Sequence, residues 1–263
     1  MSEYIKTETM WRLEDGRTEE IEDFLVRETS LELFVNGQFL QSLKCLPGDL
    51  DKLAVGFLVS EGYLSKAEDL VSLTLNPDKR TVLVVLRTPP DRMEYARLLR
   101  EKSPELDPVT HVMRLTQRVP QTRDGSGMRM AFSDLVNQFA QFIKQSETFN
   151  KVGGVHAAAL SDGTNILYHA DDVSRHNAMD RVIGAAFLDG RELGRLAVFT
   201  TGRLHVDMVA KLAVTGIPCC VTRSAPTCEA LALAQHCGLT LCGRVRSSSA
   251  LVFCGLERLC AKP

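Results

Sequence analysis

The 263-residue sequence contains no pair of cysteines separated by two residues, although it has eight cysteines. Cys45 stands alone, and the other seven fall between Cys219 and Cys260. The spacings typical of tetrahedral zinc sites are therefore absent. Most of these cysteines have apolar neighbours, so we expect them to be reduced, buried and to act as small hydrophobic residues.

The sequence also lacks a long apolar run and a large excess of charge of either sign. Runs such as Val82–Leu86 are far too short to cross a bilayer. The first residues, Met1–Trp11, do not contain the apolar segment of a signal peptide. A net charge of -2 gives no general case for nucleic acid or a membrane as partner. We expect a cytoplasmic, soluble protein that binds any anionic ligand through local clusters of positive charge.

Short-range signals predict a small mixed α+β domain over residues 1–110. Two short strands, Leu31–Val35 and Gln38–Leu43, flank Asn36-Gly37, the residue pair typical of a tight hairpin. Asp49 precedes apolar residues at helical spacing, and we expect it to cap that helix. Two further strands and one short helix are expected at Val71–Leu75, Thr81–Leu86 and Arg92–Arg100.

Residues 111–150 are predicted to form a polar loop and a connecting helix. The segment Arg114–Gly127 contains several arginines and glycines and follows two prolines, which is typical of a mobile loop. Apolar residues from Phe132 to Ile143 then recur at helical spacing, so we expect this helix to pack on the core.

The pattern from residue 151 to 263 predicts an α/β domain. The first two strands should form a hairpin around Ser161-Asp162-Gly163, whereas the later strands alternate with helices, which implies parallel pairing. The helices are expected at about Arg175–Leu188, His205–Thr215 and Thr227–His236. The strands are expected at Val155–Leu160, Asn165–His169, Leu196–Thr200, Pro218–Thr222, Leu239–Cys242 and Leu251–Phe253.

Three polar clusters lie where predicted strands end and helices begin, which is the edge where α/β sheets usually bind ligands. Each cluster combines hydroxyl groups, free backbone N–H groups and an arginine, and this combination favours phosphate. Serine and threonine cap helices routinely, and we expect Ser224 to cap the third helix with Pro226 in its first turn. Three such clusters in one domain favour a ligand with several phosphates. They are Asp171–Asp180, Thr200–Arg203 and Arg223–Thr227.

A fourth cluster, Gly243–Ser249, places two arginines and three serines between two predicted strands. It suits a phosphate or the edge of a nucleobase, and a solvated turn is the alternative. His176 lies between Arg175 and Asn177 at a helix start, and is better placed for a ligand than His156, which lies in an apolar strand. No nucleophile can be specified beside His176, and no G-x-S-x-G motif occurs.

At these clusters the sequence resembles the FdhD/NarQ family of formate dehydrogenase accessory proteins. Val152–Leu160 resembles the family's G-G-x-H-x-A-A-L segment, and Asp171–Arg181 resembles its E-D-V-G-R-H-N-A-x-D-K signature. Three further segments are similar to its S-G-R, S-x-S-A-P-T and P-G-x-x-x-E-L-A-x-G-F-L-x-x-E-G motifs. They are Thr201–Arg203, Arg223–Thr227 and Pro47–Gly62.

The resemblance implies a cytidine-deaminase-like core in the second domain, a homodimer and a role in preparing formate dehydrogenase. It also implies binding of the molybdenum bis(guanine dinucleotide) cofactor. Family members accept sulfur from a cysteine desulfurase as a persulfide on a C-x-x-C loop and pass it to that cofactor. The cofactor-binding residues expected here are His156, Asp172, Arg175, His176, Asn177, Thr201, Gly202, Arg203, Arg223, Ser224, Thr227, Arg244, Val245, Arg246, Ser247, Ser248 and Ser249.

The sequence departs from the family at the position of the sulfur carrier. The family's S-C-G-x-C-G loop should fall in about Arg114–Gly127, yet no cysteine occurs from Leu46 to Pro218. Persulfide formation needs a nucleophilic thiolate, so the resemblance assigns no catalytic cysteine in this chain. Two milder departures are Asp171 in place of a glutamate and Ser174 in place of a glycine.

Three functions are therefore compared. We favour a protein that binds the cofactor and docks formate dehydrogenase, because the ligand clusters are largely retained while the thiol loop is not. An active sulfurtransferase is the alternative, with Cys228 beside the third cluster as a weak candidate for the thiol. A nucleotide deaminase is less favoured, because His156 is not part of an H-x-E motif and Cys219-Cys220 is not part of a P-C-x-x-C motif.

Overall fold

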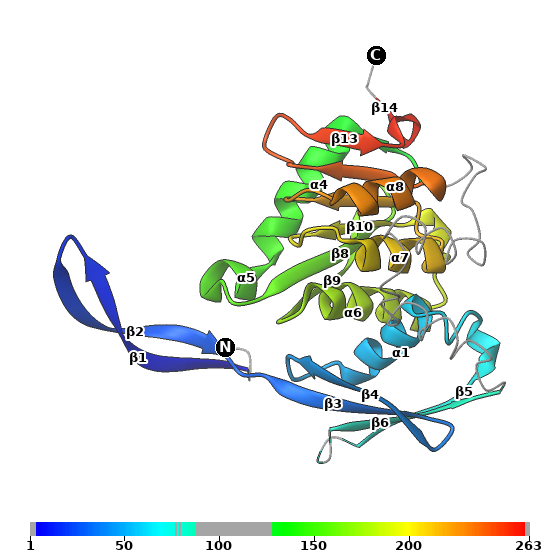
Figure 1. Ribbon diagram of the computed structural model, residues 1–263, viewed down its shortest axis with the longest axis horizontal. Coiled ribbons are helices and arrows are strands. Elements are labelled where there is room, and N and C mark those ends of the chain that lie inside the picture. Colours follow the sequence, from blue (N-terminus) through cyan, green and yellow to red (C-terminus); the bar gives the residue numbers. More distant parts are fainter. Residues whose placement is uncertain (1–3, 77, 79, 88–127, 261–263) are drawn as a thin grey trace, which may run out of the picture.

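The computed structural model describes residues 4–76, 78, 80–87 and 128–260. It consists of a layered α/β body from which a two-stranded arm projects (Figure 1). The helix predicted at Arg92–Arg100 and the loop predicted at Arg114–Gly127 lie outside the described residues. Within the described residues, no helix is long and apolar enough to cross a bilayer.

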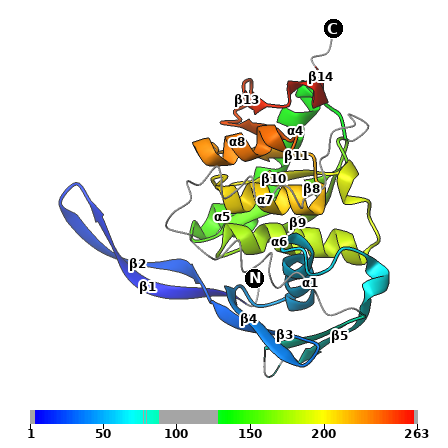
Figure 2. The same cartoon turned by 45° about the vertical axis from the view of Figure 1, so that its right-hand side comes forward.

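The arm consists of β1 (Ile5–Glu14) and β2 (Arg17–Val26), which pair antiparallel along their whole length. Asp15 and Gly16 form the turn with φ angles of 48° and 76°, as a two-residue hairpin turn requires. The arm extends away from the body in both views (Figures 1 and 2). None of the sequence-based predictions includes it, although Asp-Gly is the local signal that could have revealed it.

A four-stranded sheet of order β4-β3-β6-β5 forms the first part of the body. β3 (Thr29–Val35) and β4 (Gln38–Cys45) form the hairpin predicted at Asn36-Gly37. β5 (Leu70–Asn76) and β6 (Thr81–Leu86) form the second predicted hairpin. Alternate residues of β3 are buried, which matches the period of a strand with one face toward the core.

Helix α1 (Leu50–Ser60) follows the β3–β4 hairpin as predicted, but the start of the helix differs from the prediction. Asp49 occupies the cap position in a left-handed conformation, with φ 43° and ψ 37°, and its side chain makes no capping hydrogen bond. A side-chain cap normally requires an extended backbone. The Asp49 carboxylate instead accepts a hydrogen bond from Lys52 Nζ at 2.8 Å, so the prediction that Asp49 caps this helix is wrong.

The second part of the body is a six-stranded sheet of order β13-β12-β11-β10-β8-β9. The first two of its strands along the chain form the predicted antiparallel hairpin, and β10, β11 and β12 are parallel as predicted. The pairs β8–β10 and β12–β13 are antiparallel. The strands are β8 (His156–Ser161), β9 (Ile166–Asp172), β10 (Ala197–Thr200), β11 (Cys219–Thr222), β12 (Thr240–Gly243) and β13 (Leu251–Cys254).

Helices cover both faces of this sheet (Figures 1 and 2). One face carries α6 (Arg175–Leu188), α7 (Val206–Thr215) and α8 (Cys228–His236). The other carries α4 (Phe132–Gln145), the predicted connecting helix, which continues into α5 (Glu147–Val152). The remaining short elements are the strands β7 (Met130–Ala131) and β14 (Leu259–Cys260) and the 3-10 helices Ala67–Asp69, Leu193–Arg195 and Leu256–Arg258.

One apolar core joins the two sheets, with α1 packed on α6. Glycines allow this contact: a Cβ atom on Gly56 would lie 1.7 Å from the Asp180 carbonyl oxygen, and one on Gly184 would lie 1.9 Å from the Lys52 carbonyl oxygen. A second apolar cluster lies under α4 on the opposite face of the six-stranded sheet. The predicted α/β class is confirmed, while the division into 1–110, 111–150 and 151–263 stays a prediction.

Candidate functional site

The parallel strands β10, β11 and β12 end side by side, and three of the predicted clusters follow them. Thr200 and Thr222 are in register at the ends of β10 and β11. The Arg223 backbone N–H donates to Thr200 O at 3.3 Å, and that of Arg244 donates to Ser224 O at 2.8 Å. Backbone hydrogen bonds therefore bring these three clusters together at one edge of the sheet.

The hydroxyl groups of the strand ends bond to protein. Thr200 Oγ1 accepts from Gly202 N at 3.1 Å. Thr222 Oγ1 donates to Gly202 O at 2.6 Å and accepts from Ser224 N at 3.1 Å. These two side chains thus shape the turns of the edge.

Four arginines on this edge have exposed side chains, and none has an acidic partner within the described part of the chain. They are Arg203, Arg223, Arg244 and Arg246, and we call this set the arginine edge. Clustered charges of one sign create a potential that attracts ions of the opposite sign. The arginine edge therefore favours an anionic ligand.

The fourth cluster forms a tight turn within the arginine edge. Arg244 has a left-handed backbone with φ 51°, and Arg246 N donates to Ser249 O at 2.8 Å. Val245 is buried, whereas Ser247–Ser249 are exposed. Of this cluster, the arginines and serines are accessible to a ligand, and Val245 anchors the turn in the core.

Arg175 connects the first cluster to the second. Its side chain lies against Gly202, where an added Cβ atom would come within 2.9 Å of Arg175 Cβ. Nη2 donates to His205 Nδ1 at 3.4 Å, whereas Nε is buried and lacks a hydrogen-bond partner among the residues described. A buried donor without a partner costs about 1–3 kcal/mol, so a ligand acceptor at this position would be stabilising.

His156 lies beside these cationic groups at the start of β8. Burial lowers the pKa of His156, and the charges of Arg175, His176 and Arg203 lower it further. The ring is therefore neutral at pH 7. Its Nδ1 lies 3.4 Å from Thr201 Oγ1.

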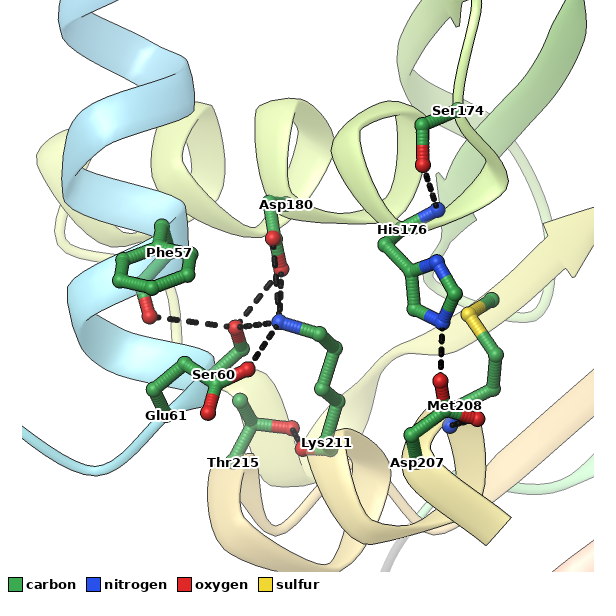
Figure 3. Close-up of polar contacts among 10 residues, drawn as sticks. All are labelled: Phe57, Ser60, Glu61, Ser174, His176, Asp180, Asp207, Met208, Lys211 and Thr215. Atoms are coloured by element: carbon green, nitrogen blue, oxygen red, sulfur yellow. Dashed lines mark hydrogen bonds and ion pairs between the residues drawn. The ribbon is translucent and has the colours of Figure 1, made fainter. Parts of the chain in front are cut away.

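His176 is held at the start of α6 by residues on both sides (Figure 3). Its backbone N–H donates to Ser174 Oγ at 3.3 Å, which caps the helix. Its Nε2 lies 2.5 Å from Asp207 Oδ2 on α7. Burial raises the pKa of Asp207, but the hydrogen bonds from His176 and from the Met208 backbone, together with the charges of His176 and Arg175, outweigh this and lower it to about 2. Asp207 was missed by sequence reasoning, because no local pattern shows that the two helix starts meet.

Asp172 and Asn177 are buried and bond to the segment that precedes α1. The Asp172 carboxylate accepts from Arg181 Nε at 2.8 Å and from Leu46 N at 3.2 Å. Asn177 Nδ2 donates to Lys44 O at 2.6 Å. These contacts hold the first part of the body against the six-stranded sheet. Direct contact of Asp172 and Asn177 with a cofactor stays a prediction.

The start of α8 corrects the prediction for Ser224. Thr227 is the cap, and its Oγ1 accepts from Ala230 N at 3.3 Å. Leu204 and Pro226 form an isolated parallel bridge. This bridge keeps the chain extended through Pro226, so the helix begins later, at Cys228, and Ser224 lies too far from it to serve as a cap.

The cysteines are mostly buried, as predicted. Burial raises the pKa of the Cys45 thiol to about 11 and that of Cys219 to about 12. Cys228 is exposed in the first turn of α8, next to the arginine edge. Within the described ranges, no group of three or more His, Cys, Asp or Glu side chains could hold a metal ion.

A separate polar cluster is buried between α1, α6 and α7 (Figure 3). Lys211 Nζ lies 3.0 Å from both carboxylate oxygens of Asp180, 2.9 Å from Glu61 Oε1 and 2.8 Å from Ser60 Oγ. Burial lowers the pKa of Lys211, but Asp180 and Glu61 more than offset this, so the pKa is raised. Asp180, the last residue of the first predicted cluster, therefore belongs to the interior of the body.

Comparison with known proteins identifies similar chains along almost the whole length. The model of the FdhD/NarQ family matches residues 26–260. The sulfur carrier protein FdhD of Shouchella clausii is 30% identical over 257 residues, covering 95% of each chain. That of Wolinella succinogenes is 32% identical over 254 residues, covering 95% of this chain and 87% of the relative.

A solved structure is also similar. The crystal structure of a proposed formate dehydrogenase accessory protein from Desulfotalea psychrophila matches with a TM-score of 0.80 and 27% identity. The match covers 98% of this chain and 100% of that chain.

Proposed function

This chain belongs to the FdhD/NarQ family, and we propose that it is an accessory protein of formate dehydrogenase that binds the molybdenum bis(guanine dinucleotide) cofactor. The observation that carries the proposal is the arginine edge, with four exposed guanidinium groups that lack acidic partners among the described residues. Guanidinium groups bind the oxygens of phosphate in a bidentate manner. Formate dehydrogenase and a homodimeric assembly are part of the same proposal.

The residues of the edge would suit a cofactor that contains two guanine dinucleotides, each with one pyrophosphate. Arg203, Arg223 and Arg244 would bind phosphate oxygens, because their side chains are exposed on linked turns. The buried Nε of Arg175 would donate to a further acceptor of the ligand. Neutral His156 would add a hydrogen bond without adding charge.

Calorimetry with GDP tests the ligand directly, because GDP carries the guanine and pyrophosphate of the cofactor. We expect the wild type to bind GDP, and Arg223→Ala to weaken binding by about 1–3 kcal/mol, the range for a charged hydrogen bond. Arg195→Ala is the matched control, since Arg195 is exposed and pairs with Glu192 at 2.7 Å. Absence of GDP binding by the wild type at millimolar concentrations would argue strongly against this site.

Sulfur transfer through Cys228 is the second candidate function, because Cys228 is exposed and next to the arginine edge. A persulfide carrier needs a reactive thiol that reaches both donor and acceptor. The family's cysteine pair is absent here, so we expect the isolated protein to be a poor acceptor of sulfur from a cysteine desulfurase. Because the similar relatives are named sulfur carrier proteins, sulfur transfer to this chain needs a direct test.

The test is incubation with a desulfurase and radiolabelled cysteine, followed by non-reducing electrophoresis. Stoichiometric label that dithiothreitol releases would overturn the expectation that the chain only binds the cofactor. Loss of that label in Cys228→Ala, but not in a Cys254→Ala control, would then identify the carrier.

A further inference from the structure

A cavity of about 420 Å³ lies beside β9, the edge strand of the six-stranded sheet. Four parts of the chain line it: β9, the junction of α4 and α5, the segment before α1 and the start of β1. A volume of this size is typical of sites for small molecules. None of the four arginines of the arginine edge is among the described residues that line the cavity. It is therefore separate from the site of the proposed function.

Asp171 of β9 supplies an acceptor to this cavity. The residue as a whole is partly buried, but its side chain is only 8% exposed. Thr148 and the Phe149 backbone N–H donate hydrogen bonds to the carboxylate. The other oxygen, Oδ1, is buried and has no hydrogen-bond partner among the residues described. Leaving a buried acceptor unsatisfied is unfavourable, so Oδ1 favours a ligand that donates a hydrogen bond.

His169, two residues earlier on β9, lines the same cavity without adding positive charge. Ser146 Oγ donates its one proton to Phe142 O at 2.9 Å, so it accepts from His169 Nε2, which also lies at 2.9 Å. Burial lowers the pKa of His169, so the ring is neutral at pH 7 and its Nδ1 is an acceptor. His169 Nε2 lies 3.8 Å from Asp171 Oδ1, too far to satisfy it.

The charges around the cavity leave one negative charge without a counter-charge. Asp49 pairs with Lys52 at 2.8 Å, and Arg181 pairs with Asp172 at 2.8 Å. The charged lining residues that have no oppositely charged partner within the described part of the chain are Glu147, Asp171 and Lys151. Two carboxylates against one ammonium favour a ligand with a single positive charge.

We propose that this cavity binds a small primary amine in its ammonium form, with one N–H donating to Asp171 Oδ1. An ammonium is a compact cation with three donors and fits a single free oxygen, whereas the fork of a guanidinium needs two. Lys151 does not supply this group, because its Nζ lies over the Phe24 ring, 3.8 Å from the centroid. The proposed function makes no use of this cavity.

Calorimetry with n-butylammonium chloride tests the site, because this probe is a small primary ammonium. We expect the wild type to bind it at millimolar concentrations. Butyltrimethylammonium chloride has the same charge without N–H donors, and 1-butanol has the same chain without the charge. Both should bind at least about tenfold more weakly. Equal binding of butyltrimethylammonium, or no binding of n-butylammonium, overturns the proposal.

Asp171→Asn tests the acceptor on the protein, because it removes the charge and keeps the shape of the side chain. It should weaken n-butylammonium binding by about tenfold or more, since hydrogen bonds between charged groups are the strong ones. Asp134→Asn is the matched control, because Asp134 is exposed on α4 and does not line the cavity. Equal binding by the wild type and Asp171→Asn overturns the proposed contact.

Glu147→Gln gives a second test that leaves Asp171 in place. It should weaken n-butylammonium binding by only about two- to fivefold, because Glu147 is exposed. A tripeptide with a central lysine carries the same ammonium group on a peptide chain. Tighter binding of this tripeptide than of n-butylammonium would assign the cavity to a protein side chain and overturn a free amine as its ligand.

GDP binding is measured on the same variants. It should be unchanged in all of them, because the cavity and the arginine edge share no residue. Retained GDP binding shows that a variant is folded, so loss of amine binding in that variant reports on the cavity alone. Failure of this inference is thereby separated from failure of the proposed function.

Discussion

Two groups of charged side chains in this molecule are built in opposite ways. In the buried cluster, Lys211 is enclosed by Asp180, Glu61 and Ser60, so each charge has a partner. At the arginine edge, four guanidinium groups are exposed and have no acidic partner within the described part of the chain. Burial makes pairing necessary, whereas water and salt screen unpaired charges at the surface. The charges of the buried cluster are thus neutralised within the fold, whereas the unpaired charges of the arginine edge favour an anionic ligand or partner.

The largest effect is expected from breaking the buried cluster. Lys211→Met should lower the free energy of unfolding by about 3–5 kcal/mol, because it leaves Asp180 and Glu61 without a counter-charge. Urea denaturation measures this loss. The control is Lys52→Met, which removes an exposed ion pair with Asp49 and should cost less than about 1 kcal/mol. Equal losses in the two variants would contradict the contrast between buried and exposed charges.

Asp171 is an intermediate case, because it is only partly buried and is incompletely paired. Its Oδ1 has no hydrogen-bond partner among the residues described, and burial raises its pKa to about 6. The ordinary pKa is about 4, so protonation favours the folded state. This contribution is fully present below about pH 4 and is lost as the pH rises to about 6.

The wild type should therefore gain about 1–3 kcal/mol of stability relative to Asp171→Asn when the pH falls from 7 to 4. The asparagine side chain does not titrate, so the variant isolates the effect of this one group. Denaturation of both proteins over this pH range is the measurement. If the free energies of unfolding of the two proteins change in parallel between pH 7 and pH 4, Asp171 does not titrate in this pH range.

A smaller effect is expected at the first turn of α6, which carries Arg175 and His176 to the edge. Ser174→Ala should cost about 1 kcal/mol because it removes the capping oxygen, whereas Ser174→Gly should cost only a few tenths. Glycine is the residue at this position of the family's signature. Thermal unfolding of both variants checks the difference. A loss in the glycine variant as large as that in the alanine variant would argue against a capping role.

The smallest effect on stability is expected at the arginine edge itself. Arg203→Ala and Arg223→Ala should change the free energy of unfolding by less than about 0.5 kcal/mol, since neither side chain bonds within the described structure. Both should still weaken GDP binding. A stability loss of several kcal/mol would mean that these arginines support the fold instead of a ligand.

Local patterns predicted most of the elements of the body. The hairpin at Asn36-Gly37 was found because its turn needs residues that tolerate positive φ, and these have φ angles of 49° and 81°. The bounds of α6 agree with the predicted helix, because the Ser174 side chain caps its first turn. The arm was missed because both of its faces are largely exposed, so its strands lack a clear alternation of apolar and polar residues.

The sequence by itself determined that several polar clusters meet at one edge, because parallel strands joined by helices bring their carboxyl ends together. Only the tertiary structure decided which of these polar groups are exposed at the surface and which bond inward. Asp172 looks like a site residue in the sequence, yet its carboxylate accepts a hydrogen bond from Leu46, which lies 126 positions away. Nothing local to either segment shows that they touch, because burial of a charge depends on chain segments that only folding brings together.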